Sequence, residues 1–479
     1  MNAISSVTAL EAVGALLFML AVLHTFSTRY FEHLAHTQPA HSGLWHLFGE
    51  VETVFGFWAL LLLAFMAFAQ GWTAASQYLD SRQFVEPMFV FVIMVIAASR
   101  PVMQLATDAV ALVARAVPLQ RSAATYFLSL SLVPLLGSLI TEPAAMTLAA
   151  LMLRDLVFSR GVPARFKYAT VGVLFVNVSI GGTLTNFAAP PVLMVAAKWD
   201  WSSAYIFSAI GWKATVAVIV NALALTLPYR RVLAERAQVG ASRARARVPA
   251  AFVAVNLGLL AGVVATNHDP EVFMGLFLIF LGLAEAYRRH HDRLILREGL
   301  MVAFFLAGLV VLGGQQKWWL RQALAGLDES ALFFGAAALT AITDNAALTY
   351  LGSLVEGVSR DFQVALVAGA VAGGGLTVIA NAPNPAGFAI LKDSFDDHSI
   401  NPLALLLAAL PPTLVAIACL WGIRGPIEEV FDIGRWQRWF SELDRAFAFM
   451  LILPFVVAAV GLWAELTLRA GRSGPDRRP

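Results

Sequence analysis

Long apolar stretches with few charges recur along the whole chain. A helix needs about 20 apolar residues to cross the hydrocarbon core of a bilayer. Stretches of about this length predict about eleven spans, at 8–26, 48–69, 86–114, 166–198, 203–228, 250–266, 271–287, 299–316, 360–392, 401–422 and 446–468. The pattern therefore predicts an all-α polytopic membrane protein whose surroundings are the lipid bilayer.

The composition agrees with this pattern. Of the 479 residues, 59% are hydrophobic and only 13% are charged, whereas a soluble globular protein has about 25% charged residues. The formal net charge is +2, and the arginines gather in loops between the apolar stretches. Such loops indicate orientation in the membrane rather than a nucleic-acid partner.

Two short phrases each occur twice in the chain. The first reads ITEPAAMTLAAL at Ile140–Leu151 and ITDNAALTYLGS at Ile342–Ser353. The second reads GGTLTNFAAPP at Gly181–Pro191 and GGGLTVIANAP at Gly373–Pro383. Each copy of the first phrase carries one acid, Glu142 or Asp344. Matching, glycine- and proline-interrupted halves are typical of secondary transporters, whose site lies where the repeats meet.

The basic loops predict the orientation. Residues 229–249 and 288–297 are rich in arginine, which places them in the cytoplasm, whereas Asn267–Glu271 has acids and no Lys or Arg. The basic loops give one consistent orientation only if residues 122–157 and 330–357 do not cross the membrane. Each segment would instead enter the membrane and return as a re-entrant hairpin, the two from opposite sides. The two halves are then inverted repeats, with the N-terminus outside and the C-terminus cytoplasmic.

The predicted division of the chain follows from this orientation. Residues 1–228 form the first repeat and residues 250–422 the second, and the basic cytoplasmic linker 229–249 joins them. Residues 423–479 contribute an amphipathic segment, an extra helix and a basic cytoplasmic tail.

The second phrase predicts that the spans 166–198 and 360–392 are broken helices. Glycines weaken a helix, and prolines prevent normal helical bonding. The predicted unwinding glycines are Gly181, Gly182, Gly373 and Gly374. Unwound backbone frees carbonyl groups, and the polar side chains beside them are Thr185, Asn186, Thr377 and Asn381. Such oxygens suit a hard cation like Na⁺.

The hairpin tips are predicted to add the carboxylates and their neighbours, Thr141, Glu142, Thr343, Asp344 and Asn345. An acid at the bilayer centre costs about 2.5–3.5 kcal/mol, so two at matching positions indicate function. A buried carboxylate binds either a proton or a metal cation, which suffices for exchange. We therefore predict Na⁺ at Asp344 and Glu142, with Asp344 as the first choice for the essential carboxylate.

Two further polar residues lie within the predicted spans. Asn177 either lines the site or forms a hydrogen bond between helices. Lys213 is either a counter-charge for Glu142 and Asp344 or a locally paired residue.

These motifs resemble a known group. The layout of two hairpins and two broken helices resembles the ion transporter superfamily of sodium/dicarboxylate symporters, arsenite pumps and NhaD-type antiporters. Within it, Thr343–Ala347 and Gly181–Thr185 look most similar to a bacterial family of Na⁺/H⁺ antiporters. The resemblance implies a homodimer in the bacterial cytoplasmic membrane, with a scaffold and an elevator-like transport domain.

The resulting hypothesis is a cation/proton antiporter that exchanges Na⁺, or Li⁺ or K⁺, for H⁺ without any cofactor. The alternative is a sodium-coupled carrier of an anion or organic acid, such as a dicarboxylate or arsenite. The acids at both tips would repel an anion, which favours the antiporter. A membrane-embedded enzyme is a third class, but no nucleophile–base pair or metal-ligand spacing is evident, so we expect no enzyme.

Overall fold

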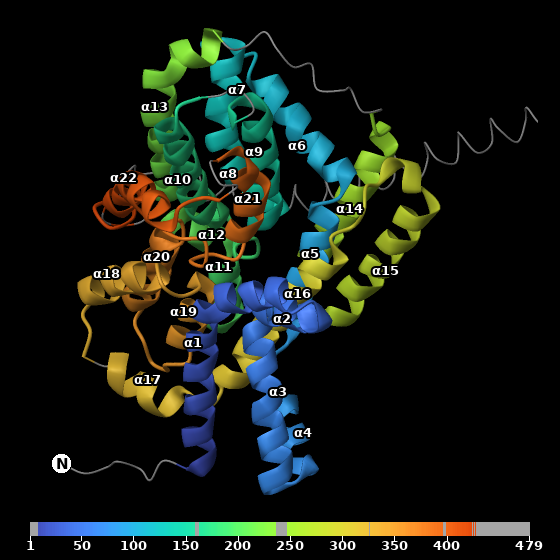
Figure 1. Cartoon of the computed structure of the whole chain (residues 1–479), viewed down its shortest axis with the longest axis vertical. Helices are drawn as coiled ribbons and strands as arrows, with labels where there is room; N and C mark the ends of the chain where they lie inside the picture. Colours follow the sequence, from blue (N-terminus) through green and yellow to red (C-terminus); the bar gives the residue numbers. More distant parts are fainter. Residues whose placement is uncertain are drawn as a thin grey trace, which may run out of the picture.

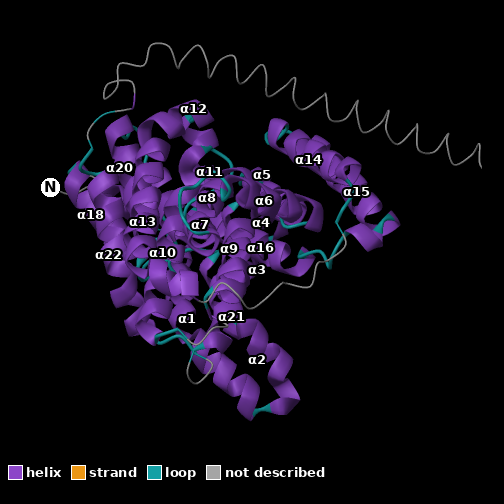
Figure 2. Cartoon of the chain, turned by 90° about the horizontal axis from the view of Figure 1, so that it is seen from above, coloured by secondary structure: helices purple, strands orange, loops and turns teal. Residues whose placement is uncertain are grey.

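The computed structural model describes residues 8–158, 162–235, 247–324, 326–395 and 399–423, together with Gly425 and Ile427. Within these residues every regular element is a helix (Figures 1 and 2). Part of the predicted basic linker, residues 236–246, lies outside the described residues. So do the predicted helix 446–468 and the basic tail.

Long apolar helices account for much of the fold. Within the described residues, five helices are long and apolar enough to cross a membrane. The number of such spans is seven if two bent pairs of helices each form one span. The five comprise α1 (Ala9–Thr37), α3 (Val51–Gln70), α12 to α13 (Ser203–Ile206 and Trp212–Glu235, joined by the π-helix Phe207–Gly211), α16 (Leu296–Gly313) and α22 (Pro402–Leu420). The chain is thus an all-α, multi-pass membrane protein.

Large apolar side chains also cover its outer surface. Phe68 is 93% exposed and Leu414 is 62% exposed. Exposed apolar surface of this kind suits lipid rather than water.

The remaining predicted spans are shorter or bent. Helices α14 (Ala250–Ala265) and α15 (Pro270–Ala286) have 16 and 17 residues. The predicted span 86–114 is a pair, α5 (Val85–Ala97) and α6 (Arg100–Val113), bent by 65°. Pro101 at the start of α6 disfavours a continuous helix across this bend. The second bent pair, α7 (Arg121–Leu130) and α8 (Leu132–Ile140), turns by 43°.

The two repeated phrases occupy turns and helix interruptions. Around the first phrase, α8 turns at Thr141 into α9 (Glu142–Leu156), and α18 (Glu329–Thr340) is followed by α19 (Asn345–Ser353). Around the second, α10 (Ala164–Gly181) is followed by α11 (Pro190–Trp199), and α20 (Arg360–Gly373) by α21 (Asn384–Leu391). The 3₁₀ turn Gly182–Leu184 follows α10 directly.

The packing of these elements is reciprocal between the two halves. Helix α21 of the second half packs on α9 of the first, and α11 of the first half packs on α19 of the second. Each interrupted helix therefore places its second part against the acid-bearing turn of the other half. Figure 1 shows α8, α9 and α21 grouped near the middle of the molecule.

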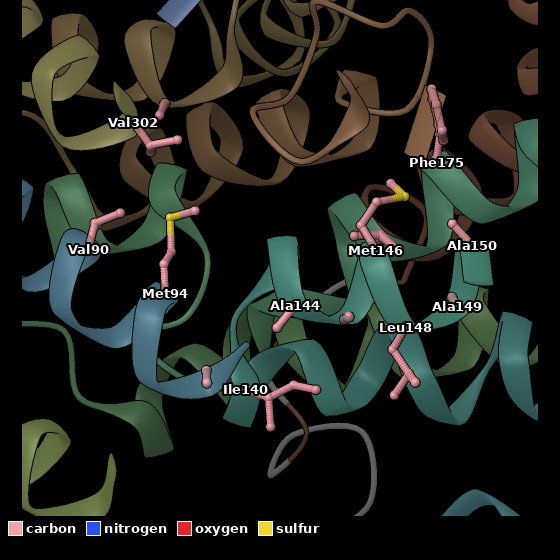
Figure 3. Close-up of a cluster of buried hydrophobic side chains, with 14 of the residues drawn as sticks. Val90, Met94, Ile140, Ala144, Met146, Leu148, Ala149, Ala150, Phe175 and Val302 are labelled. Atoms are coloured by element: carbon pink, nitrogen blue, oxygen red, sulfur yellow. The ribbon is translucent and has the colours of Figure 1, made fainter. Parts of the chain in front are cut away.

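Small side chains allow this close packing. Helix α9 buries Ala144, Ala149 and Ala150, and Met146 points toward α10, where Phe175 lies (Figure 3). A methyl group on Gly387 of α21 would meet both Met146 and Phe175, at 2.6 and 3.0 Å. The backbone of α21 can therefore approach α9 only because position 387 is glycine.

Other helices complete the body around this centre. The remaining α-helices are α2 (Ser42–Gly49), α4 (Trp72–Asp80) and α17 (Lys317–Leu324). Helices α1, α3 and α16 pack together, as do α14, α15 and α5. In both overall views α14 and α15 lie together at one edge of the molecule (Figures 1 and 2).

Candidate functional site

Glu142 is the most deeply buried acid of the two phrases. Its side chain is fully inaccessible and stands at the first position of α9. One carboxyl oxygen, Oε2, accepts a hydrogen bond from Asn381 Nδ2 at 2.9 Å. The other, Oε1, has no hydrogen-bond partner among the described residues. The positive end of the α9 dipole stabilises negative charge here, but it does not satisfy the free oxygen.

The backbone of the broken helix α10–α11 touches this carboxyl group. A methyl group on Gly182 would overlap Glu142 Oε1 and lie 2.6 Å from its Cγ. Glycine is therefore required at this point for the close approach. Gly181 has a similar role, because a methyl group there would lie 2.7 Å from the carbonyl oxygen of Pro134 in α8.

The turn before Glu142 is strained. Thr141 has φ of 72°, and its buried Oγ1 forms no hydrogen bond with any described residue. Threonine is β-branched, so positive φ is costly, on the order of 1–3 kcal/mol. Strain of this size at a buried polar turn is typical of functional sites.

The equivalent turn of the second half carries Asn345 at the position where the first carries Pro143. Asn345 is fully buried, and within the part of the chain that the structure describes neither its Oδ1 nor its Nδ2 has a hydrogen-bond partner. Its backbone N–H donates to Ala380 O at 3.1 Å, which ties the turn to the unwound segment. Gly374 lies beside it, since a methyl group there would overlap Ser179 Oγ and lie 2.8 Å from Asn345 Nδ2. Gly373 similarly packs against the backbone of Ala337 in α18.

Asn384 stabilises the unwound segment between α20 and α21, and it was not among the residues predicted from the sequence. It is fully buried, and its Nδ2 donates to Gly374 O and Thr377 O, both at 2.8 Å. Its backbone N–H donates to Asn381 O at 3.0 Å, and its Oδ1 is unpaired. The available signal was its position beside Pro385 at the end of the second phrase, but it has no polar counterpart in the first copy, where Val192 stands.

The result is a cluster of buried oxygens without partners around the interrupted helices. Such groups are rare in folded proteins, because each costs about 1–3 kcal/mol unless something binds it. The members are Thr141 Oγ1, Glu142 Oε1, Asn345 Oδ1, Asn381 Oδ1 and Asn384 Oδ1. We name them the oxygen cluster. One carboxylate with neutral hydroxyl and amide oxygens is a donor set that suits a monovalent hard cation.

Asp344 has a different environment from Glu142. It is half-buried, and its Oδ1 accepts hydrogen bonds from the backbone N–H groups of Ala346 and Ala347 at 2.8 and 3.1 Å. It therefore caps α19. It also lines a cavity of about 100 Å³, formed with side chains of α1, α3 and α16 such as Phe18, Phe55 and Phe305.

The two threonines of the second phrase make matching hydrogen bonds. Thr185 Oγ1 donates to Ser138 O at 2.7 Å, and Thr377 Oγ1 donates to Ala341 O at 2.8 Å. Each joins an unwound segment to the turn region of its own half. Ser138 adds a second link, since its hydroxyl donates to Gly181 O at 2.7 Å and accepts from Leu184 N–H at 2.9 Å.

Other predicted site residues lie elsewhere. Asn177 is a helix–helix link, donating to Leu130 O and Val218 O at 2.7 and 3.1 Å and accepting from Asn221 at 2.9 Å. Asn186 donates to Trp201 O at 2.8 Å and lines a cavity with Glu86 and Asp200. Thr343 donates to Leu339 O at 2.9 Å and lines the same cavity as Asp344. Lys213 lines a separate cavity with Glu329 and Asp361.

The fold and the oxygen cluster define a class of protein. Interrupted helices that cross-pack around a buried carboxylate, in an all-α membrane protein, are features of secondary transporters. The chain belongs to the family described as "Putative Na+/H+ antiporter", whose pattern matches residues 9–423. A comparison with curated proteins finds no match.

Proposed function

We propose that this protein exchanges Na⁺ for H⁺ across the membrane, with Glu142 as the carboxylate for which the two ions compete. The oxygen cluster is the observation that carries the proposal. Membership of a Na⁺/H⁺ antiporter family supports the same general function.

Competition at Glu142 follows from the chemistry of the group. When ionised, the carboxylate places a negative charge beside Thr141, its neighbour in the chain, and Asn381, its hydrogen-bond partner, and each of these has an oxygen without a partner among the described residues. A bound Na⁺ compensates both the charge and the unpaired oxygens. When protonated, the carboxyl group is neutral and becomes a hydrogen-bond donor, so a cation is no longer favoured. One ion therefore displaces the other.

Asp344 is proposed as the second acid of the exchange. It lies on the turn related to Glu142 by the repeat. Its cavity lies between α19 and the helices α1, α3 and α16. We propose that this cavity connects the site to one side of the membrane.

The mechanism we propose is alternating access by an elevator-like movement. Helices α9, α11, α19 and α21 cross-pack around the site and would move as one transport domain. Helices α1, α3 and α16 pack on one another and would form part of a static scaffold. The turns at Thr141 and Asp344 would belong to re-entrant hairpins of two inverted repeats. A homodimer in the bacterial cytoplasmic membrane completes the proposal.

The exchange is tested with purified protein in liposomes that contain a pH-sensitive dye. Adding Na⁺, Li⁺ or K⁺ in turn to one side should dissipate an imposed pH gradient for at least one of them. Glu142→Gln and Asp344→Asn should each abolish this response while remaining folded. If no cation dissipates the gradient but a dicarboxylate enters together with Na⁺, the protein is a sodium-coupled carrier and the antiporter proposal fails.

The proposed orientation is tested separately by cysteine labelling. Cys419 is the only cysteine of the sequence, so Cys419→Ser gives a clean background. Asn267→Cys should react with a membrane-impermeant maleimide added to intact cells, whereas Asp155→Cys should react only after permeabilisation. The reverse pattern would invert the orientation and leave the exchange proposal intact.

A further inference from the structure

A wide cavity lies outside the oxygen cluster, where α15 ends and α16 begins. It has a volume of about 850 Å³ and combines apolar walls with arginines, including Arg288, Arg293 and Arg297. Figures 1 and 2 show α15 at the edge of the molecule. We name this cavity the α15–α16 pocket.

The charges in the pocket are only partly balanced. Arg288 pairs with Glu285, and Arg297 pairs with Glu50, the residue before α3. Asp292 lies 4.0 Å from Arg100. Arg293 makes no hydrogen bond or ion pair with any of the described residues. A guanidinium group with five donors is thus available to an anion.

A histidine in the same pocket is also without partners. Both ring nitrogens of His291 are buried, and neither has a hydrogen-bond partner among the described residues. A buried imidazole without partners is costly. Both nitrogens are inaccessible in this structure, so the imidazole ring would have to turn toward the cavity before its N–H group could donate to a ligand oxygen.

Exposed apolar side chains flank the pocket on both helices. Leu278 and Ile279 of α15 are 64% and 55% exposed, and Leu300 of α16 is 60% exposed. Helix α16 is long and apolar enough to cross a membrane, so its apolar surface faces acyl chains. An occupant that satisfies both the arginines and these flanks must have an anionic head and apolar chains.

We propose that the α15–α16 pocket binds the phosphate headgroup of an anionic phospholipid. Arg293 and His291 donate hydrogen bonds to the phosphate oxygens, and the acyl chains lie along the exposed faces of α15 and α16. Basic pockets at the cytoplasmic ends of membrane helices recognise anionic headgroups in this way. Inorganic phosphate would leave the apolar flanks uncovered, which is why the proposal commits to a lipid. None of the residues that line the pocket belongs to the oxygen cluster.

The test measures lipid binding to the purified, delipidated full-length protein by native mass spectrometry. The probes are phosphatidylglycerol and phosphatidylethanolamine with identical acyl chains. The protein should retain phosphatidylglycerol preferentially. Arg293→Gln should weaken this binding about fivefold, since one arginine contributes about 1 kcal/mol near an anionic lipid. Arg293→Lys, which keeps the charge, should retain most of the binding.

The matched control is Arg321→Gln, which removes an exposed arginine from α17 outside the pocket. This variant should bind phosphatidylglycerol like the unmodified protein. Equal binding of the two lipids, or equal losses in the Arg293 and Arg321 variants, would overturn the proposal. Displacement of bound phosphatidylglycerol by millimolar inorganic phosphate would also overturn it, because the pocket would then recognise free phosphate. Thermal unfolding without lipid verifies that each variant is folded.

Discussion

Removing the amide of Asn381 probes the proposed competition at Glu142 without removing the carboxyl group itself. The Nδ2 of Asn381 donates the one hydrogen bond that Glu142 receives among the described side chains, at 2.9 Å. Asn381→Ala deletes this donor and the unpaired Oδ1 of the oxygen cluster. Both changes favour the protonated carboxyl group over the cation-bound one.

The size of the effect follows from the hydrogen bond. A hydrogen bond to a charged group contributes about 1.5–3 kcal/mol. Since 1.4 kcal/mol is a factor of ten in an equilibrium constant, the Na⁺ concentration for half-maximal exchange should rise roughly 10- to 150-fold. The same loss makes the proton harder to remove. Exchange should therefore become half-maximal at a pH about one to two units higher.

The assay is the dissipation of a pH gradient in liposomes, measured over a series of Na⁺ concentrations and pH values. Asn256→Ala is the matched control, because Asn256 is 2% exposed on α14 and bonds only within its own helix, to Phe252 O. This variant should keep the original Na⁺ requirement and pH profile. A folded Asn381→Ala protein with an unchanged Na⁺ requirement and pH profile would refute the assignment of Glu142 as the shared site.

Two further substitutions test the backbone around the carboxyl group. Gly182→Ala should abolish exchange because the added methyl group overlaps the Glu142 carboxyl group, whereas Gly275→Ala, with nothing within 4 Å, should exchange normally. Thr141→Gly should relieve the positive φ and leave the melting temperature unchanged or higher, yet weaken Na⁺ binding because the hydroxyl is lost. A melting temperature that falls, measured by thermal unfolding, would contradict the strain argument.

The helical character of the fold could be predicted from the sequence because each apolar stretch has the length that a bilayer requires. The exact number of spans could not. Helices α14 and α15 have 16 and 17 residues, and the predicted span 86–114 bends by 65°. Whether such a short or bent helix crosses the membrane or stops within it depends on the helices that pack against it. The sequence alone does not specify those contacts.

The residues of the candidate site that could be predicted from the sequence all lie within the repeated phrases. Glu142, Asp344 and the glycines stood out because each occurs in two copies. The contact of Asn381 with Glu142 joins residues 239 positions apart, and no local pattern predicts it. Asn384 escaped notice for the opposite reason, since the corresponding position in the first copy is valine. The repeat therefore indicated the acids and glycines that both halves share. The match between the two copies gave no signal for Asn381 and Asn384, which only the second half has.

That difference bears directly on exchange. The repeat gives both halves an acid at the same position, yet only Glu142 is fully buried with an unpaired oxygen, whereas Asp344 caps α19 and lines a cavity. A carboxylate already bonded to backbone N–H groups has less to gain from a cation than one that is not. The asymmetry therefore favours Glu142 over Asp344 as the cation ligand. Asp344 lies at the boundary between α19 and the helices α1, α3 and α16, so it is better placed than Glu142 to exchange protons with one side of the membrane.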